Sequence, residues 1–168
     1  MGTRHIIKVI KNGEVKINQY GQWDGYPEGQ GERILKFFKN KKRVASLHKK
    51  LDRVRFLDDT RDNDFIEKFD NPQTRTPEMS DWYDTYIHRD LGAMILTTVT
   101  NSKDKEILLM NSGAYLGDAS IEWEYEIDLD KNTLKVSSCG MKQSLTFQLD
   151  NLPKPKEFYR MIKDVEND

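Results

Sequence analysis

The sequence predicts an α+β fold in which an antiparallel sheet, built from an N-terminal hairpin and a C-terminal meander, packs against several helices. Three observations predict it. Asn12-Gly13 separates two runs rich in β-branched residues, which is a strong hairpin signal. Apolar spacings of three and four then dominate the middle of the chain. Strict alternation returns over residues 121–127. Because strands and helices come in blocks, we expect one α+β domain over residues 1–168.

The strands are predicted from β-branched runs and from alternation. Residues 3–11 and 14–21 flank the Asn-Gly turn. In the segment 121–127, apolar residues occupy the odd positions and glutamates the even ones, so Trp123 and Tyr125 should be buried and the opposite face acidic. Apolar residues around 134–136 and 145–149 predict two further antiparallel strands.

The helices are predicted from amphipathic spacing. The segment 80–98 carries the longest apolar stripe and is expected to be the central core helix. Residues 106–110 favour a short strand or a helical turn, and residues 111–119, with Gly113 and Gly117, a loop. The other expected helices cover residues 28–39, the apolar series from Val44 to Val54, a short segment that contains Phe65, Ile66 and Phe69, and a final segment that starts at Pro153 and Pro155.

The helix expected around the apolar series from Val44 to Val54 is strongly basic on its polar face. A solvated surface is the usual reason for such a face, and contact with an anion or a nucleic acid is the alternative. The residues concerned are Lys41, Lys42, Arg43, Lys49, Lys50, Arg53 and Arg55.

Composition limits the classes of function. The chain has 27 Lys and Arg against 28 Asp and Glu, so its net charge of -1 gives no overall attraction to nucleic acid or to an anionic membrane. Its single cysteine, Cys139, permits no intrachain disulfide and is expected to be half-buried. No apolar run is long enough to cross a bilayer. We therefore expect a cytoplasmic protein that binds neither nucleic acid nor membrane.

Metal and cofactor signatures are missing from the sequence. His5, His48 and His88 do not stand at ligand spacing, and one cysteine cannot complete a zinc site. The aspartate-rich segments 58–64 and 128–132 lack the glycine and the final glutamate of a calcium-binding EF-hand loop. The sequence predicts no metal and no cofactor.

The best candidate site is the segment 20–31, Tyr-Gly-Gln-Trp-Asp-Gly-Tyr-Pro-Glu-Gly-Gln-Gly. Glycine is used where the backbone needs a positive φ or a close approach. Glycines interleaved with aromatic residues therefore indicate a tight loop with rings against its backbone, launched from the hairpin and leading into a helix. The candidate ligand-binding or partner-binding residues are Arg4, Tyr20, Gln22, Trp23, Asp24, Tyr26, Glu28 and Gln30.

This motif, together with Met-Gly-Thr-Arg at residues 1–4 and Glu-Trp-Glu-Tyr-Glu-Ile-Asp-Leu-Asp-Lys-Asn-Thr-Leu at 122–134, resembles an uncharacterised family of small proteins of bacteriophages and mobile elements. The resemblance implies no established activity. A phage setting implies a protein that binds or sequesters a host component, such as an immune-defence protein or its nucleotide messenger, in the host cytoplasm.

Several functions fit these residues. The leading hypothesis is a non-enzymatic binding protein that inhibits a host protein or sequesters a nucleotide-like ligand through the loop 20–31. Trp23 and Tyr26 could instead simply close one end of the core. A small hydrolase or transferase could use Asp24 or Glu28, with Arg4 holding a loop carboxylate. An acidic nucleic-acid mimic could use Glu122, Glu124, Glu126 and Asp128.

Overall fold

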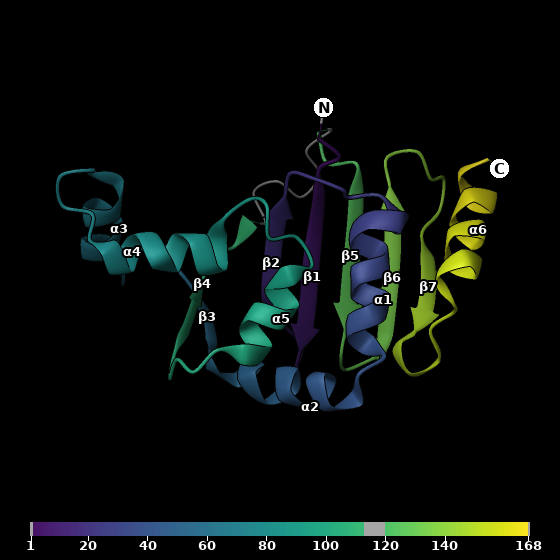
Figure 1. Cartoon of the computed structure of the whole chain (residues 1–168), viewed down its shortest axis with the longest axis horizontal. Coiled ribbons are helices and arrows are strands. Elements are labelled where there is room, and N and C mark those ends of the chain that lie inside the picture. Colours follow the sequence, from purple (N-terminus) through teal and green to yellow (C-terminus); the bar gives the residue numbers. More distant parts are fainter. Residues whose placement is uncertain (1, 113–119, 168) are drawn as a thin grey trace.

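The structure is a computed structural model that describes residues 2–112 and 120–167. The expected loop over residues 111–119, with Gly113 and Gly117, falls largely outside the described residues. The predicted α+β class is confirmed, because a mostly antiparallel sheet packs against helices (Figure 1).

Five strands form the main sheet in the spatial order β2-β1-β5-β6-β7. All neighbours are antiparallel except β1 and β5, which run parallel and place Ile7 opposite Tyr125. This parallel pair joins the N-terminal hairpin and the C-terminal meander in one sheet. The strands are β1 (His5–Lys11), β2 (Glu14–Gly21), β5 (Trp123–Asp128), β6 (Thr133–Ser138) and β7 (Leu145–Gln148).

The hairpin and the alternating strand agree with the sequence prediction. Asn12 and Gly13 have φ angles of 55° and 71°, as a two-residue hairpin turn requires. Trp123 and Tyr125 are buried on one face of β5, whereas Glu124 and Glu126 are only half-buried on the other. Asp128, expected on the exposed acidic face, is buried instead, with its Oδ1 accepting hydrogen bonds from the N–H groups of Asp130 and Lys131. Lys8 forms an ion pair with Glu126 at 3.0 Å, which partly neutralises the acidic face.

Helices cover one face of the sheet, where α1 and α5 lie in front of the strands (Figure 1). α6 reaches the same core through Phe158, whose ring centroid is 5.1 Å from that of Phe147 in β7. The buried cluster joins the covered face of the sheet to these helices. The helices are α1 (Glu32–Phe38), α2 (Lys41–Lys50), α3 (Asn63–Asp70), α4 (Pro77–Trp82), α5 (Met94–Asn101) and α6 (Pro155–Glu166), with short turns η1 (Pro27–Gly31), η2 (Leu51–Arg53), η3 (Tyr83–Ile87) and η5 (Leu149–Asn151).

The prediction of a single helix over residues 80–98 is wrong. The chain forms α4 and η3, leaves helical geometry at His88 with ψ 134°, and starts α5 only at Met94. Gly92 has φ +48°, which an α-helix cannot contain. Only the second part, α5, is a core helix, through Ile95, Leu96 and Val99.

A second, small sheet of two strands was predicted only in part from the sequence. Of the two alternatives for residues 106–110, the short strand is present as β4 (Ile107–Leu109), and it pairs in parallel with β3 (Val54–Phe56), a segment expected to end a helix. Cys139 is exposed rather than half-buried, because it lies in the turn that follows β6.

Beyond the small sheet, α3 and α4 project from the body of the protein (Figure 1). We call residues 58–82 the arm. No residue of α3 or α4 is fully buried. The Trp82 ring packs edge-on against Phe65 and Phe69, at centroid distances of 5.0 and 5.5 Å, so the arm has a small aromatic core of its own.

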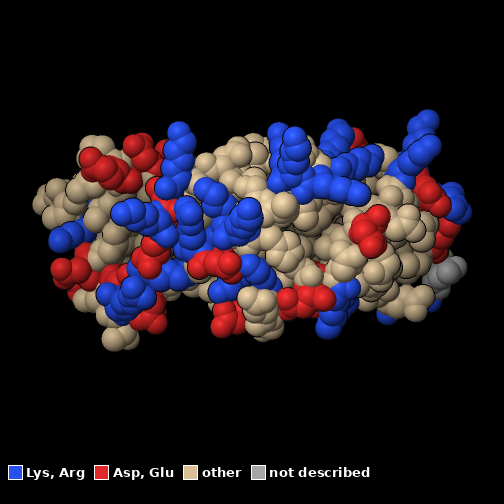
Figure 2. All heavy atoms as spheres, turned by 90° about the horizontal axis from the view of Figure 1, so that it is seen from below, with Lys and Arg blue, Asp and Glu red and all other residues tan. Residues whose placement is uncertain are grey.

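α2 follows the C-terminal end of α1 and crosses below the sheet in the view of Figure 1. Figure 2 views this face and shows many Lys and Arg side chains on it, with uncharged surface and several Asp and Glu side chains between them. Asn40 caps α2 by accepting a hydrogen bond from the backbone N–H of Arg43 at 3.1 Å.

Candidate functional site

The loop over residues 20–31 crosses the end of the sheet at which β1 begins and enters α1 through η1 (Figure 1). Backbone hydrogen bonds fix its course. The N–H of Gly25 donates to the Thr3 carbonyl at 3.0 Å, and that of Gln30 donates to the Asp24 carbonyl at 2.8 Å. The predicted origin of the loop on the hairpin and its continuation into a helix are therefore confirmed.

Gln30 joins the loop to a distant turn. Its side chain is 2% exposed, donates from Nε2 to the Trp23 carbonyl at 3.1 Å and accepts from the N–H of Ala93 at 2.8 Å. Both ends of the amide are therefore used inside the protein. This candidate ligand-binding residue positions the loop and does not offer its side chain to a ligand.

Tyr125 supports the loop from below. Its buried hydroxyl donates to the Gly25 carbonyl at 2.7 Å, and burial raises the pKa of the phenol well above its ordinary value. Since the hydroxyl stays protonated, it can remain a donor, and the central strand β5 holds the loop backbone in place.

His5 explains two of the glycines. Its buried imidazole lies so close to the backbone of Gly21 that a β-carbon there would come within 2.2 Å of the ring. At Gly25 a β-carbon would lie 2.9 Å from His5 Cβ and 2.6 Å from the Thr3 carbonyl oxygen. The glycines therefore permit the loop to close over the histidine. Burial lowers the pKa of His5 to about 4, so the ring is neutral at pH 7.

Four of the candidate residues project from this fixed backbone. Trp23 is 45% and Tyr26 40% exposed, and the side chains of Asp24 and Glu28 are also exposed. Asp24 has φ 56°, a conformation that Asp and Asn tolerate better than most residues. The Tyr26 hydroxyl donates to Asp24 Oδ1 at 3.2 Å, which raises the pKa of Tyr26. We call Trp23, Asp24, Tyr26 and Glu28 the loop surface.

A shallow depression of about 250 Å³ lies beside the loop surface and is lined by polar residues. Glu32 and Lys36 form an ion pair across one wall at 2.6 Å, and Tyr159 donates a hydrogen bond to Glu32. Sequence reasoning missed Glu32, Arg33 and Lys36. Glu28, Glu32 and Lys36 stand four residues apart, and this helical spacing was a usable signal.

The remaining candidates do not join the loop surface. The Tyr20 hydroxyl donates to Gln22 Oε1 at 2.5 Å, so these two half-buried side chains are engaged with each other. Among the described residues, Arg4 makes no ion pair with Asp24 or Glu28, and its Nε is buried without a hydrogen-bond partner. Side chains alternate between the two faces of an extended chain. Because the ring of the next residue, His5, meets the loop, the Arg4 side chain should point away from it.

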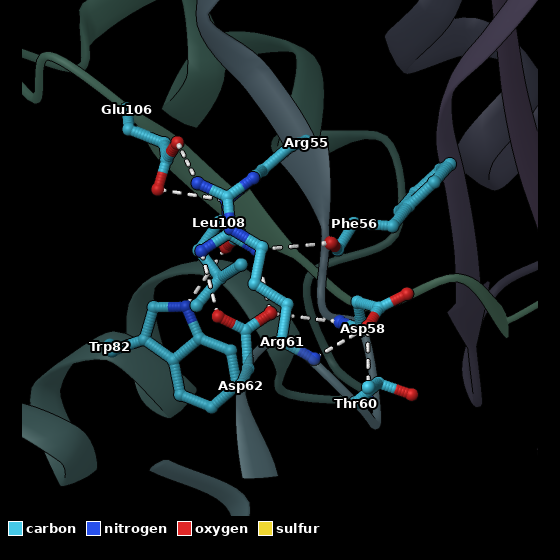
Figure 3. Close-up of polar contacts among 9 residues, drawn as sticks. All are labelled: Arg55, Phe56, Asp58, Thr60, Arg61, Asp62, Trp82, Glu106 and Leu108. Carbon is cyan, nitrogen blue, oxygen red and sulfur yellow. Dashed lines mark hydrogen bonds and ion pairs between the residues drawn. The ribbon is translucent and has the colours of Figure 1, made fainter. Parts of the chain in front are cut away.

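A separate polar cluster lies at the base of the arm (Figure 3). Arg55 donates to both carboxylate oxygens of Asp62, at 2.6 and 2.8 Å, and forms an ion pair with Glu106 at 2.8 Å. The hydrogen bonds from Arg55 are the main reason that the pKa of Asp62 falls to about 2. Trp82 Nε1 donates to the Leu108 carbonyl at 2.9 Å. Because these contacts tie the arm to β3 and β4, the cluster is structural.

Within residues 2–112 and 120–167, no group of three or more His, Cys, Asp or Glu side chains is placed to hold a metal ion. No helix in the same ranges is long and apolar enough to cross a membrane.

The chain matches no model of a protein family, and neither curated proteins nor solved structures gave a match to it. Function must therefore be argued from the site itself.

Proposed function

We propose that this protein acts by binding, without catalysis, and that the loop surface recognises a protein partner. The supporting observation is that Trp23 and Tyr26 remain about half exposed on a backbone that Gln30 and Tyr125 hold in place. Large aromatic side chains on a rigid support are typical of residues that dominate the energy of protein interfaces. A fixed loop also loses little conformational entropy on binding.

The chemistry of the loop surface favours a basic segment of the partner. Aromatic faces attract the cationic groups of Arg and Lys, and the carboxylates of Asp24 and Glu28 lie beside the two rings. Glu28 is only weakly engaged, since its nearest cation is Lys163 at 3.9 Å. An arginine or lysine of the partner could therefore meet both an aromatic face and a carboxylate.

A nucleotide-like ligand fits this surface less well. The depression of about 250 Å³ is smaller than a typical ligand pocket of roughly 300–1,000 Å³. Three carboxylates and two cations line it (Asp24, Glu28, Glu32, Arg33 and Lys36), and Lys36 is already paired with Glu32, so the excess negative charge disfavours phosphate. The resemblance to proteins of bacteriophages and mobile elements supports a host protein as the partner and inhibition in the host cytoplasm as the outcome.

Selection from a displayed library of random peptides tests the proposal. The wild-type protein should enrich peptides that carry Arg or Lys, and Trp23→Ala and Asp24→Asn should each lose most of the binding. Asn tolerates the positive φ of position 24, so the second variant removes only the charge. Met110→Ala, which truncates a side chain 42% exposed directly after β4, is the control and should bind normally.

Circular dichroism and thermal unfolding must show that each variant is folded. Peptide binding that survives both loop substitutions would refute the proposal. Saturable binding of nucleotides in calorimetry, lost in Trp23→Ala, would replace the protein partner with a small ligand, and turnover of that ligand would establish an enzyme.

A further inference from the structure

A second concave site lies at the other end of α1 from the loop surface. Its volume is about 460 Å³, within the usual range of ligand pockets. Four parts of the chain enclose it: the end of α1, α2, the segment after β5 and the residues around η5. We call this site the α2 groove. It shares no lining residue with the depression beside the loop surface.

The floor of the α2 groove is apolar. Phe38 and Leu149 belong to the buried core, and Val44, Leu129 and Leu152 are partly buried against it. Apolar side chains that line an open groove remain in contact with water, and a ligand with an apolar body would remove that contact. The floor therefore favours a ligand that carries hydrocarbon.

The rim of the groove is basic. Lys39 and Lys41 both line it, and within residues 2–112 and 120–167 no carboxylate lies within ion-pair distance of either ammonium group. Asp150 is the one acidic lining residue. No acidic residue occurs between Glu32 and Asp52, so Lys42, Arg43 and Lys49 add to the positive charge of α2.

We propose that the α2 groove binds a small amphipathic organic acid, with its apolar body on the floor and its carboxylate held by Lys39 and Lys41. Nucleic acid fits less well, because a phosphate backbone gains from a basic surface but not from an apolar floor. The enclosed volume suits a single medium-length chain or one to two aromatic rings. This site is independent of the proposed protein-binding loop.

The test uses octanoate as the ligand and 1-octanol as its uncharged counterpart. Both are measured by displacement of 8-anilinonaphthalene-1-sulfonate, a fluorescent apolar anion. We expect one saturable site for octanoate on the wild-type protein. The double variant Lys39→Ala/Lys41→Ala should lose about tenfold in octanoate affinity, equivalent to about 1.4 kcal/mol, and little in octanol affinity.

Ala45→Trp provides the second variant. Ala45 is exposed and lines the groove, so a tryptophan there should fill the site without disturbing the core, and binding of both ligands should be lost. Lys42→Ala/Lys49→Ala is the matched control, because it removes two positive charges from α2 outside the groove, and it should change affinity less than about twofold. Absence of saturable octanoate binding, or octanoate binding that persists in Ala45→Trp, would overturn the proposal. An equal loss in Lys42→Ala/Lys49→Ala would reduce the effect to general charge attraction and overturn it also.

Discussion

Acidification should destabilise the protein through His5. The ring is completely buried, and burial lowers its pKa from 6.5 in the unfolded chain to about 4 in the folded protein. Between these two values the unfolded chain binds a proton that the folded protein does not, so stability falls as the pH falls. The shift of about 2.5 pKa units corresponds to a loss of about 2 kcal/mol by pH 5 and about 3 kcal/mol by pH 4.

The loss can be isolated by comparing urea unfolding of wild type and His5→Gln from about pH 7.5 to 4. Glutamine stays neutral throughout, so the pH dependence that the two proteins share cancels in the difference between them. We expect the stability difference to shrink by about 3 kcal/mol across this range. Parallel pH profiles for the two proteins, or an NMR titration that gives His5 a pKa near 6.5, would refute the reasoning.

Two further predictions concern the supports of the loop and of the arm. Tyr125→Phe should cost about 1–3 kcal/mol in urea unfolding, because it leaves the buried Gly25 carbonyl without its donor; unchanged stability would mean that the hydroxyl does not support the loop. Asp62→Asn should speed proteolysis within residues 58–82 without changing hydrogen exchange in the main sheet, because it removes the negative charge of the carboxylate to which Arg55 donates two hydrogen bonds. An equal rate of cleavage in wild type and variant would show that the arm is held by its aromatic contacts instead.

Local patterns made the strands of the main sheet predictable. Asn12-Gly13 predicted the hairpin, and the alternation around Trp123 predicted the buried face of β5. Both features could be predicted because they depend on residues that are close in the sequence. The break between α4 and α5 could not be predicted from local sequence patterns. Ala93 donates to Gln30, which lies 63 residues earlier, and the turn at Gly92 depends on that distant contact.

The same distinction applies to the site. Glycines among aromatic residues indicated the tight loop, and Trp23 and Tyr26 are exposed on it. Gln30 looked like a ligand-binding side chain because its two internal partners cannot be found from spacing. The α2 groove was not predicted either, since its walls come from four separate parts of the chain.

The parallel pairing of β1 with β5 has a consequence for how the protein folds. Lys8 and Glu126, partners across this pair, are 118 residues apart. Closing a loop of this length costs about 2 kcal/mol more entropy than closing one of about ten residues. The N-terminal hairpin can form early during synthesis, but β1 has its second neighbour only when β5 has emerged from the ribosome. Until then one edge of the hairpin is unpaired, so cooperative folding of the sheet should follow synthesis of the C-terminal strands.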